Sequence, residues 1–126
     1  MLKILLVGAG GFVGSICRYV LSGMVYQIVP PRVSLPYGTL LVNVLGCILI
    51  GFLSGLTETR QLFNPETRVL VFIGLLGAFT TYSTFGYETF ALARDGQYVT
   101  AISNISLHLC LGLGAVWLGH SLSKLV

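Results

Sequence analysis

Charged residues are scarce in this sequence of 126 residues. Lysine and arginine number 7 and aspartate and glutamate 4, so that charged residues make up 9% of the chain and hydrophobic residues 55%. Soluble domains carry about a quarter charged residues, and a soluble chain of this length has far more surface than so few polar groups can cover. The composition therefore excludes an ordinary soluble domain and predicts that lipid covers the apolar excess. A net charge of +3, scattered along the chain, does not favour nucleic-acid binding.

Clustered cysteines and early acidic residues are also missing. Cys17, Cys47 and Cys110 lie in apolar stretches without a CxxC pair or metal-ligand spacing, and we interpret them as packing residues. Residues 2–15 resemble the first strand and glycine turn of a dinucleotide-binding fold, but that fold needs an acidic residue about 20 positions later, and none occurs before Glu58. With no nucleophile–base constellation either, the sequence predicts a protein that is not an enzyme.

Four segments are long and apolar enough to cross a bilayer, which takes about 20 residues. They comprise residues 4–29, 37–56, 68–93 and 98–122. Their expected stops are Pro30-Pro31-Arg32, the polar residues 57–61 and Arg94-Asp95-Gly96. Asn64 followed by Pro65 predicts a capped start for the third helix. A cleaved signal peptide would be an alternative for the first segment, but that segment is too long and Arg18 interrupts it.

The chain length and the short connections predict one all-α unit of four antiparallel transmembrane helices, with residues 1–126 as a single domain. Its positive charges do not favour one orientation, although cytoplasmic loops normally carry the excess. One side is expected to hold Lys3, Arg60, Arg68 and Lys124, and the other Arg32 and Arg94, with Arg18 if it reaches that way. Two copies of opposite orientation could then pair as an antiparallel dimer, although a single topology stays open.

Polar residues inside two spans predict either interhelical hydrogen bonds or a wetted path, because polar groups in lipid face a bundle interior or water. Thr39 and Asn43 lie four apart on one face of the second helix. Thr100, Asn104 and His108 form a stripe over two turns of the fourth.

The middle of the third span predicts a break in its helix. Two glycines, Gly74 and Gly77, precede a run of threonine and serine, and both kinds of residue weaken a helix. Unwound backbone at this depth is tolerated where it is buried in protein or lines a cavity, and its free carbonyls can coordinate a cation.

Three motifs resemble the CrcB/Fluc family of fluoride channels over nearly the whole chain. Residues 10–14 read GGFVG and are followed by Arg18-Tyr19, residues 38–46 read GTLLVNVLG, and residues 74–85 read GLLGAFTTYSTF. The family usually has phenylalanine where this chain has Tyr82.

The resemblance implies a fluoride-selective channel that lets cytoplasmic fluoride leave the cell passively and so lowers its toxicity. It also implies an antiparallel, dual-topology homodimer with two pores in the cell (inner or plasma) membrane, and a structural Na⁺ at the dimer interface held by the backbone carbonyls of Gly77 and Thr80. The residues that would line the fluoride path are Asn43, Tyr82, Ser83, Thr84, Phe85, Asn104 and His108.

Two other kinds of membrane protein remain as alternatives. A small four-helix drug exporter would need a membrane-embedded glutamate in its first helix, and this first helix carries Arg18 and no acid. A purely structural membrane subunit would predict no ion flux from the purified protein.

Overall fold

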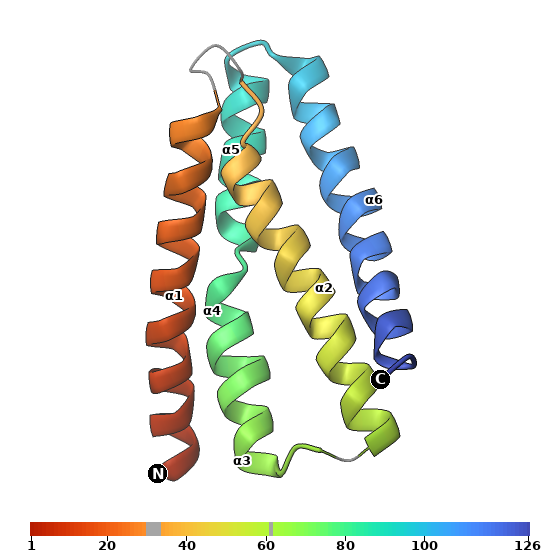
Figure 1. Ribbon diagram of the computed structural model, residues 1–126. Coiled ribbons are helices and arrows are strands. Elements are labelled where there is room, and N and C mark those ends of the chain that lie inside the picture. The colour runs from red at the N-terminus through yellow and green to blue at the C-terminus, as the bar shows by residue number, and fades with distance from the viewer. Residues whose placement is uncertain (30–33, 61) are drawn as a thin grey trace.

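The long helices of this protein stand side by side as a bundle (Figure 1). The computed structural model describes residues 1–29, 34–60 and 62–126. Within these ranges, four helical stretches are long and apolar enough to cross a membrane, namely Leu2–Ile28, Tyr37–Arg60, Pro65–Arg94 and Tyr98–Ser123. The prediction of an all-α chain with four candidate spans is confirmed.

The third of these stretches is composite. It begins with α3 (Pro65–Arg68), continues as the π-helix η1 (Val69–Leu76) and α4 (Gly77–Phe79), and resumes after an interruption as α5 (Tyr82–Arg94). Thr80 and Thr81 have extended backbone angles, with ψ of 160° and 113°. The predicted break is therefore confirmed, whereas a π-helix was not expected. Such wide turns are rare and often lie at functional sites.

The other three stretches are single helices, α1 (Leu2–Ile28), α2 (Tyr37–Arg60) and α6 (Tyr98–Ser123). α1 packs mainly against η1 and α4, α2 packs mainly against α6, and α5 also contacts α6. Both termini lie at the same end of the bundle (Figure 1). The break in the third stretch lies about midway between the two ends of the bundle.

Glycines allow these helix pairs to approach closely. A Cβ at Gly10 would lie 2.9 Å from the backbone nitrogen of Leu75, and one at Gly51 would lie 3.1 Å from that of His120. Close contacts of this kind are typical of small residues between helices in lipid. Both contacts join helices of the same chain.

The ends of the helices mostly agree with the sequence. Asn64 Oδ1 accepts a hydrogen bond from Thr67 N at 2.8 Å, as predicted for a cap, and α5 ends at Arg94 before Gly96, whose φ is 77°. The prediction that the second helix stops at residues 57–61 is wrong for residues 57–60, because α2 continues to Arg60. The helix tolerates its threonines because their hydroxyls find acceptors on the helix itself, as in Thr57 Oγ1 to Leu53 O at 2.8 Å and Thr59 Oγ1 to Gly55 O at 2.9 Å. Gln61 and the predicted stop Pro30-Pro31-Arg32 lie outside the described residues.

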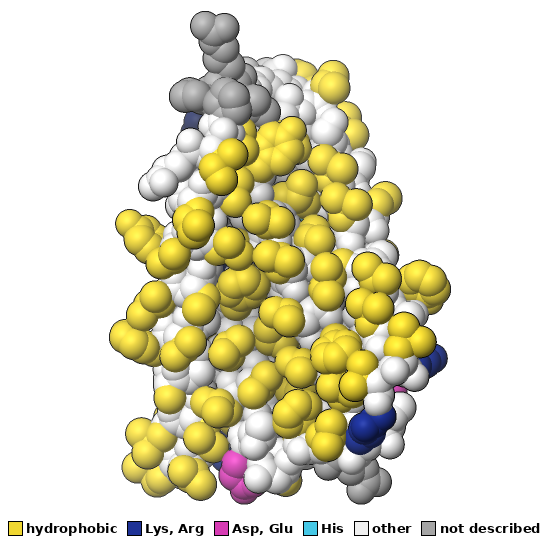
Figure 2. Space-filling model, viewed as in Figure 1, with side chains coloured by type: hydrophobic (Ala, Val, Ile, Leu, Met, Phe, Trp, Pro, Cys, Tyr) yellow, Lys and Arg dark blue, Asp and Glu magenta, His cyan; other side chains and the backbone are white. Residues whose placement is uncertain are grey.

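Large apolar side chains cover the outside of the bundle (Figure 2). Phe12, Ile73 and Trp117 are examples, each more than 60% exposed. In the same view the visible charged side chains lie toward the ends, most of them at the end that holds the termini. An apolar exterior with polar groups at the ends is the pattern expected of a protein whose solvent is a bilayer.

Candidate functional site

The break in the third stretch is held by Asn43 of α2. Asn43 Oδ1 accepts from the backbone nitrogen of Thr81 at 2.8 Å, and Asn43 Nδ2 donates to the carbonyl of the same residue at 3.1 Å. In an uninterrupted α-helix the Thr81 N–H would donate to the carbonyl of Gly77, four residues earlier. The amide of Asn43 therefore replaces that helical bond and keeps one Nδ2 hydrogen for a further acceptor.

Arg18 approaches the same break from α1. Its Nη1 lies 3.5 Å from the carbonyl oxygen of Thr80, at the long limit for a hydrogen bond. The side chain thus turns toward the middle of the bundle and not toward its end. The charge count at the end opposite the termini then rests on Arg94 within the described ranges, while Arg32 lies outside them.

A cavity of about 380 Å³ opens beside the break, between α2, the third stretch and α6. It brings together six of the residues that the resemblance assigns to the ion path or to sodium. Those six are Asn43, Gly77, Thr80, Tyr82, Phe85 and His108. No lysine, arginine, aspartate or glutamate stands among the described residues that line it.

Three rings follow one another along the wall of this cavity. The ring centroids of Tyr82 and Phe85 are 5.7 Å apart, and those of Phe85 and His108 are 4.4 Å apart. Tyr82 is 84% exposed, so this chain covers little of its ring. Both separations are within contact range for ring pairs.

The hydrogen bond of His108 fixes which of its ring nitrogens carries the proton. Nδ1 lies 2.9 Å from the backbone carbonyl of Asn104, and because a carbonyl can only accept, Nδ1 must donate. In the neutral ring Nε2 then has a free lone pair. Nε2 is buried and has no hydrogen-bond partner within the part of the chain that the structure describes.

Asn104 lies outside the cavity-lining set. It is fully buried, and its Nδ2 donates to Thr89 Oγ1 at 2.9 Å. The Thr89 hydroxyl in turn donates to the carbonyl of Phe85 at 2.7 Å. Asn104 and Thr89 thus connect α6 to the backbone of Phe85. The sequence did not indicate Thr89, because a lone threonine in a helix carries no signal of its own.

Ser83 and Thr84 also lie outside the residues that line the cavity. Both are exposed at the start of α5. Thr81 Oγ1 accepts from Thr84 N at 3.3 Å and lies 2.9 Å from Thr84 Oγ1, which caps the helix. Their role toward an ion stays a prediction, as does that of Asn104.

A second polar cluster connects three helices near the break. Glu88 Oε1 accepts from Thr39 Oγ1 at 2.7 Å and from the Tyr26 hydroxyl at 3.4 Å. Thr39 and Asn43, which the sequence places on one face of α2, therefore both contact the third stretch. Tyr26 could not be linked to them without knowing how α1 packs.

Comparison with known proteins assigns the family. The family model described as "CrcB-like protein, Camphor Resistance (CrcB)" matches residues 5–120. The chain belongs to the CrcB-like family. This assignment confirms the resemblance and, together with the four candidate spans, makes the chain a multi-pass membrane protein.

Curated relatives of this CrcB-like chain carry the name of a channel. A "Fluoride-specific ion channel FluC" of Nitratidesulfovibrio vulgaris is 43% identical over 126 residues, which is the full length of both chains. "Fluoride-specific ion channel FluC 1" of Methanosarcina acetivorans is 45% identical over 119 residues, covering 94% of this chain and 88% of the relative. Another "Fluoride-specific ion channel FluC", of Shewanella loihica, is 43% identical over 122 residues, covering 97% of this chain and 96% of the relative. Because these relatives are channels, the expectation that the chain is not an enzyme is confirmed.

Proposed function

We propose that this chain is a fluoride-selective ion channel through which cytoplasmic fluoride leaves the cell passively, which lowers fluoride toxicity. The relatives named as fluoride-specific channels support the ion. The observation that carries the proposal is the cavity at the break, which combines an amide donor with aromatic rings and has no charged side chain among its described lining residues.

The chemistry of this cavity suits a small, strongly hydrated anion. Removing water from fluoride costs a great deal of free energy unless other donors replace it. Asn43 has one Nδ2 hydrogen to offer, and the edges of aromatic rings such as Phe85 carry partial positive charge. A wall without fixed positive charge holds the ion weakly enough to release it. Chloride is larger, so a narrow aromatic passage excludes it.

The channel is proposed to be a dual-topology homodimer with two pores. One chain leaves Tyr82 84% exposed beside the cavity, and a second copy would supply the missing wall. The close glycine contacts are already used within one chain, so the dimer must form through other residues. The pairing of opposite orientations is supported by positive charges at both ends of the bundle, including Lys3 at one end and Arg94 at the other.

A structural Na⁺ is proposed at the dimer interface, held by the carbonyls of Gly77 and Thr80. The two residues fit a hard cation that takes oxygen ligands. The Thr81 N–H, which in a regular helix would donate to the Gly77 carbonyl, donates to Asn43 Oδ1 instead. The space beside Gly77 is open, since the nearest atom to an added Cβ would be the Phe72 carbonyl oxygen at 3.7 Å. Unwound carbonyls of this kind coordinate Na⁺ in other membrane proteins. The ion would have a structural role and bridge these carbonyls. Its site would belong to a channel domain spanning residues 1–126 of an inner or plasma membrane protein.

Ion efflux from liposomes that contain only the purified protein tests the proposal. A potassium ionophore balances the charge, a fluoride electrode follows one sample, and a chloride electrode follows a parallel one. Protein-free liposomes report the leak of the lipid alone. Rapid fluoride release with little chloride release is the expected result, whereas no fluoride release from a folded dimer would contradict the channel function and favour a structural subunit.

A further inference from the structure

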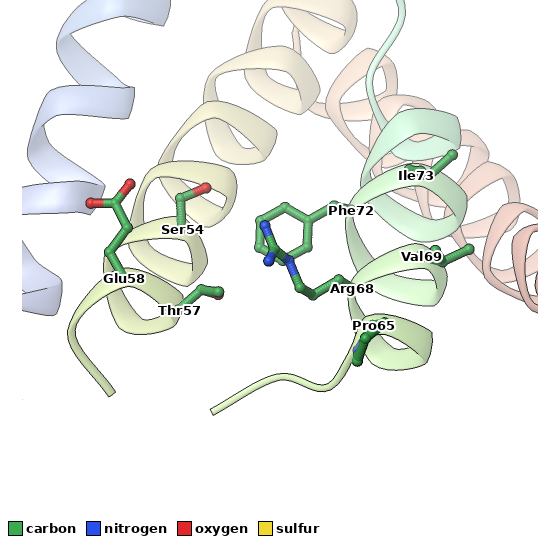
Figure 3. A pocket seen from close by; sticks show the side chains of 8 residues that line it. All are labelled: Ser54, Thr57, Glu58, Pro65, Arg68, Val69, Phe72 and Ile73. Atoms are coloured by element: carbon green, nitrogen blue, oxygen red, sulfur yellow. The ribbon is translucent and has the colours of Figure 1, made fainter. Parts of the chain in front are cut away.

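A second hollow lies at the end of the bundle that holds both termini. This end groove, of about 520 Å³, runs between α2 on one side and α3 and η1 on the other (Figure 3). Its lining consists of Ser54, Thr57, Glu58, Pro65, Arg68, Val69, Phe72 and Ile73. Figure 3 shows the guanidinium of Arg68 between the two walls, beside the ring of Phe72.

The charge of Arg68 is not neutralised by a carboxylate within the described residues. The ion pair found there joins Arg94 to Asp95, far along the chain. Glu58 also lines the end groove, but it equally lines a neighbouring hollow with His120 of α6. In Figure 3 its carboxylate points toward the α6 side of α2, away from the guanidinium. The end groove therefore presents a positive charge beside the neutral hydroxyls of Ser54 and Thr57.

The end groove borders the cavity at the break. Phe72 lines both hollows. On α2, Asn43, Cys47 and Ile50 line the cavity and Ser54 lines the groove. These four residues follow one another at spacings of three or four, which places them on a single face of the helix. One face of α2 therefore runs from the positively charged end to the aromatic rings.

We propose that the end groove is the outer entrance of the anion path and that Arg68 draws small hydrated anions into it. The inference rests on the proposed channel function and adds an entrance and a recruiting residue. A positive charge beside a low-dielectric wall raises the local concentration of anions. Because Arg68 is exposed, water and salt screen its field, so it concentrates anions without binding any of them tightly. Selection of fluoride then takes place at the cavity.

Fluoride efflux at two ionic strengths tests the role of Arg68. Arg68→Gln removes the charge, Arg68→Lys keeps it, and Arg60→Gln removes a charge at the same end that does not line the groove. At about 0.01 M ionic strength, where the Debye length is about 30 Å, Arg68→Gln is expected to slow fluoride efflux about 3- to 10-fold. At about 1 M the difference should shrink to less than about 1.5-fold. Arg68→Lys should match the unmodified chain at both, and Arg60→Gln should slow efflux less than Arg68→Gln does.

If Arg68→Gln does not fold, a substitution that adds positive charge to the groove tests the same inference. Thr57→Lys adds a second positive charge to the same groove and should accelerate efflux at low ionic strength only. An unchanged rate for Arg68→Gln at low ionic strength, or an equal loss at both, overturns the inference, as does a Thr57→Lys rate that salt does not affect. Absence of fluoride flux from the unmodified chain at either ionic strength is a different result, because it contradicts the channel function itself.

Discussion

The cavity at the break and the end groove differ in what makes them polar. The cavity combines a side-chain amide with aromatic rings and has no charged residue among its described lining residues, whereas the groove holds Arg68 and Glu58. Deep in a bilayer a full charge is costly and would hold a counter-ion tightly. At the end of the bundle water screens it. The proposed path would therefore attract anions at its mouth and still release them inside.

The largest expected effect comes from removing the amide at the break. Asn43→Ala leaves the N–H and the carbonyl of Thr81 without their partners, which should lower the free energy of unfolding by about 2–4 kcal/mol. Fluoride efflux should fall at least about 100-fold, which corresponds to about 2.8 kcal/mol at roughly 1.4 kcal/mol per factor of ten. Thermal unfolding in detergent and liposome efflux measure the two losses.

Cys47→Ala is the matched control for this change. Cys47 lies one turn from Asn43 on the same face of α2 and lines the same cavity. It should retain most of the flux. If Asn43→Ala conducted fluoride as well as Cys47→Ala, conduction would not depend on the amide, and the proposal that the cavity is the ion path would be contradicted.

The aromatic wall should give the next largest effect. Phe85→Ile removes the ring that contacts both Tyr82 and His108, and fluoride efflux should fall about 10- to 100-fold, since ring-edge contacts contribute about 1–3 kcal/mol in total. Phe90→Ile on the same helix is the control, because Phe90 is 62% exposed on the apolar exterior. Equal flux and equal fluoride preference in both variants would show that the ring does not face the ion.

A substitution at Asn104 distinguishes a structural role of this residue from a role in the ion path. Asn104→Leu removes the hydrogen bond to Thr89, which should cost about 0.5–1.5 kcal/mol of stability and leave the fluoride preference unchanged. A double-mutant cycle with Thr89→Val should return an interaction of the same size. A stable Asn104→Leu variant that admits chloride would instead place Asn104 on the path.

Tyr82→Phe should have the smallest effect. It restores the residue that the family usually has and keeps the ring beside Phe85. The hydroxyl of an exposed ring is expected to contribute less than about 0.7 kcal/mol, so efflux should change by less than about 3-fold. A larger change in parallel liposome assays would mean that the hydroxyl takes part in conduction.

The sequence predicted the elements of this fold well because each one has a local cause. Apolar length defines the four stretches, Asn64 before Pro65 defines a cap, and glycines followed by threonines define the break. The end of α2 was harder to predict, since polar residues such as Thr57 can bond to their own helix. The π-helix η1 has no comparable local signature, and its wide turns pack against α1.

The candidate site was harder to predict because the direction of a side chain depends on tertiary packing. Asn104 and His108 share one stripe on α6, yet one is fully buried against Thr89 and the other lines the cavity. Spacing places both on one side of the helix, but it cannot show which neighbour each meets. The same applies to Tyr26, whose hydroxyl meets Glu88 only through the way in which the helices pack.

The reversal potential of the purified protein in a planar bilayer tests the central claim most directly. One side holds a fluoride salt and the other holds the chloride salt of the same cation at equal concentration, so that any potential reports the preference between the two anions. We predict a large reversal potential, positive on the fluoride side, because fluoride leaving through the cavity at the break is not balanced by chloride entering. A reversal potential near zero would contradict a fluoride-selective path.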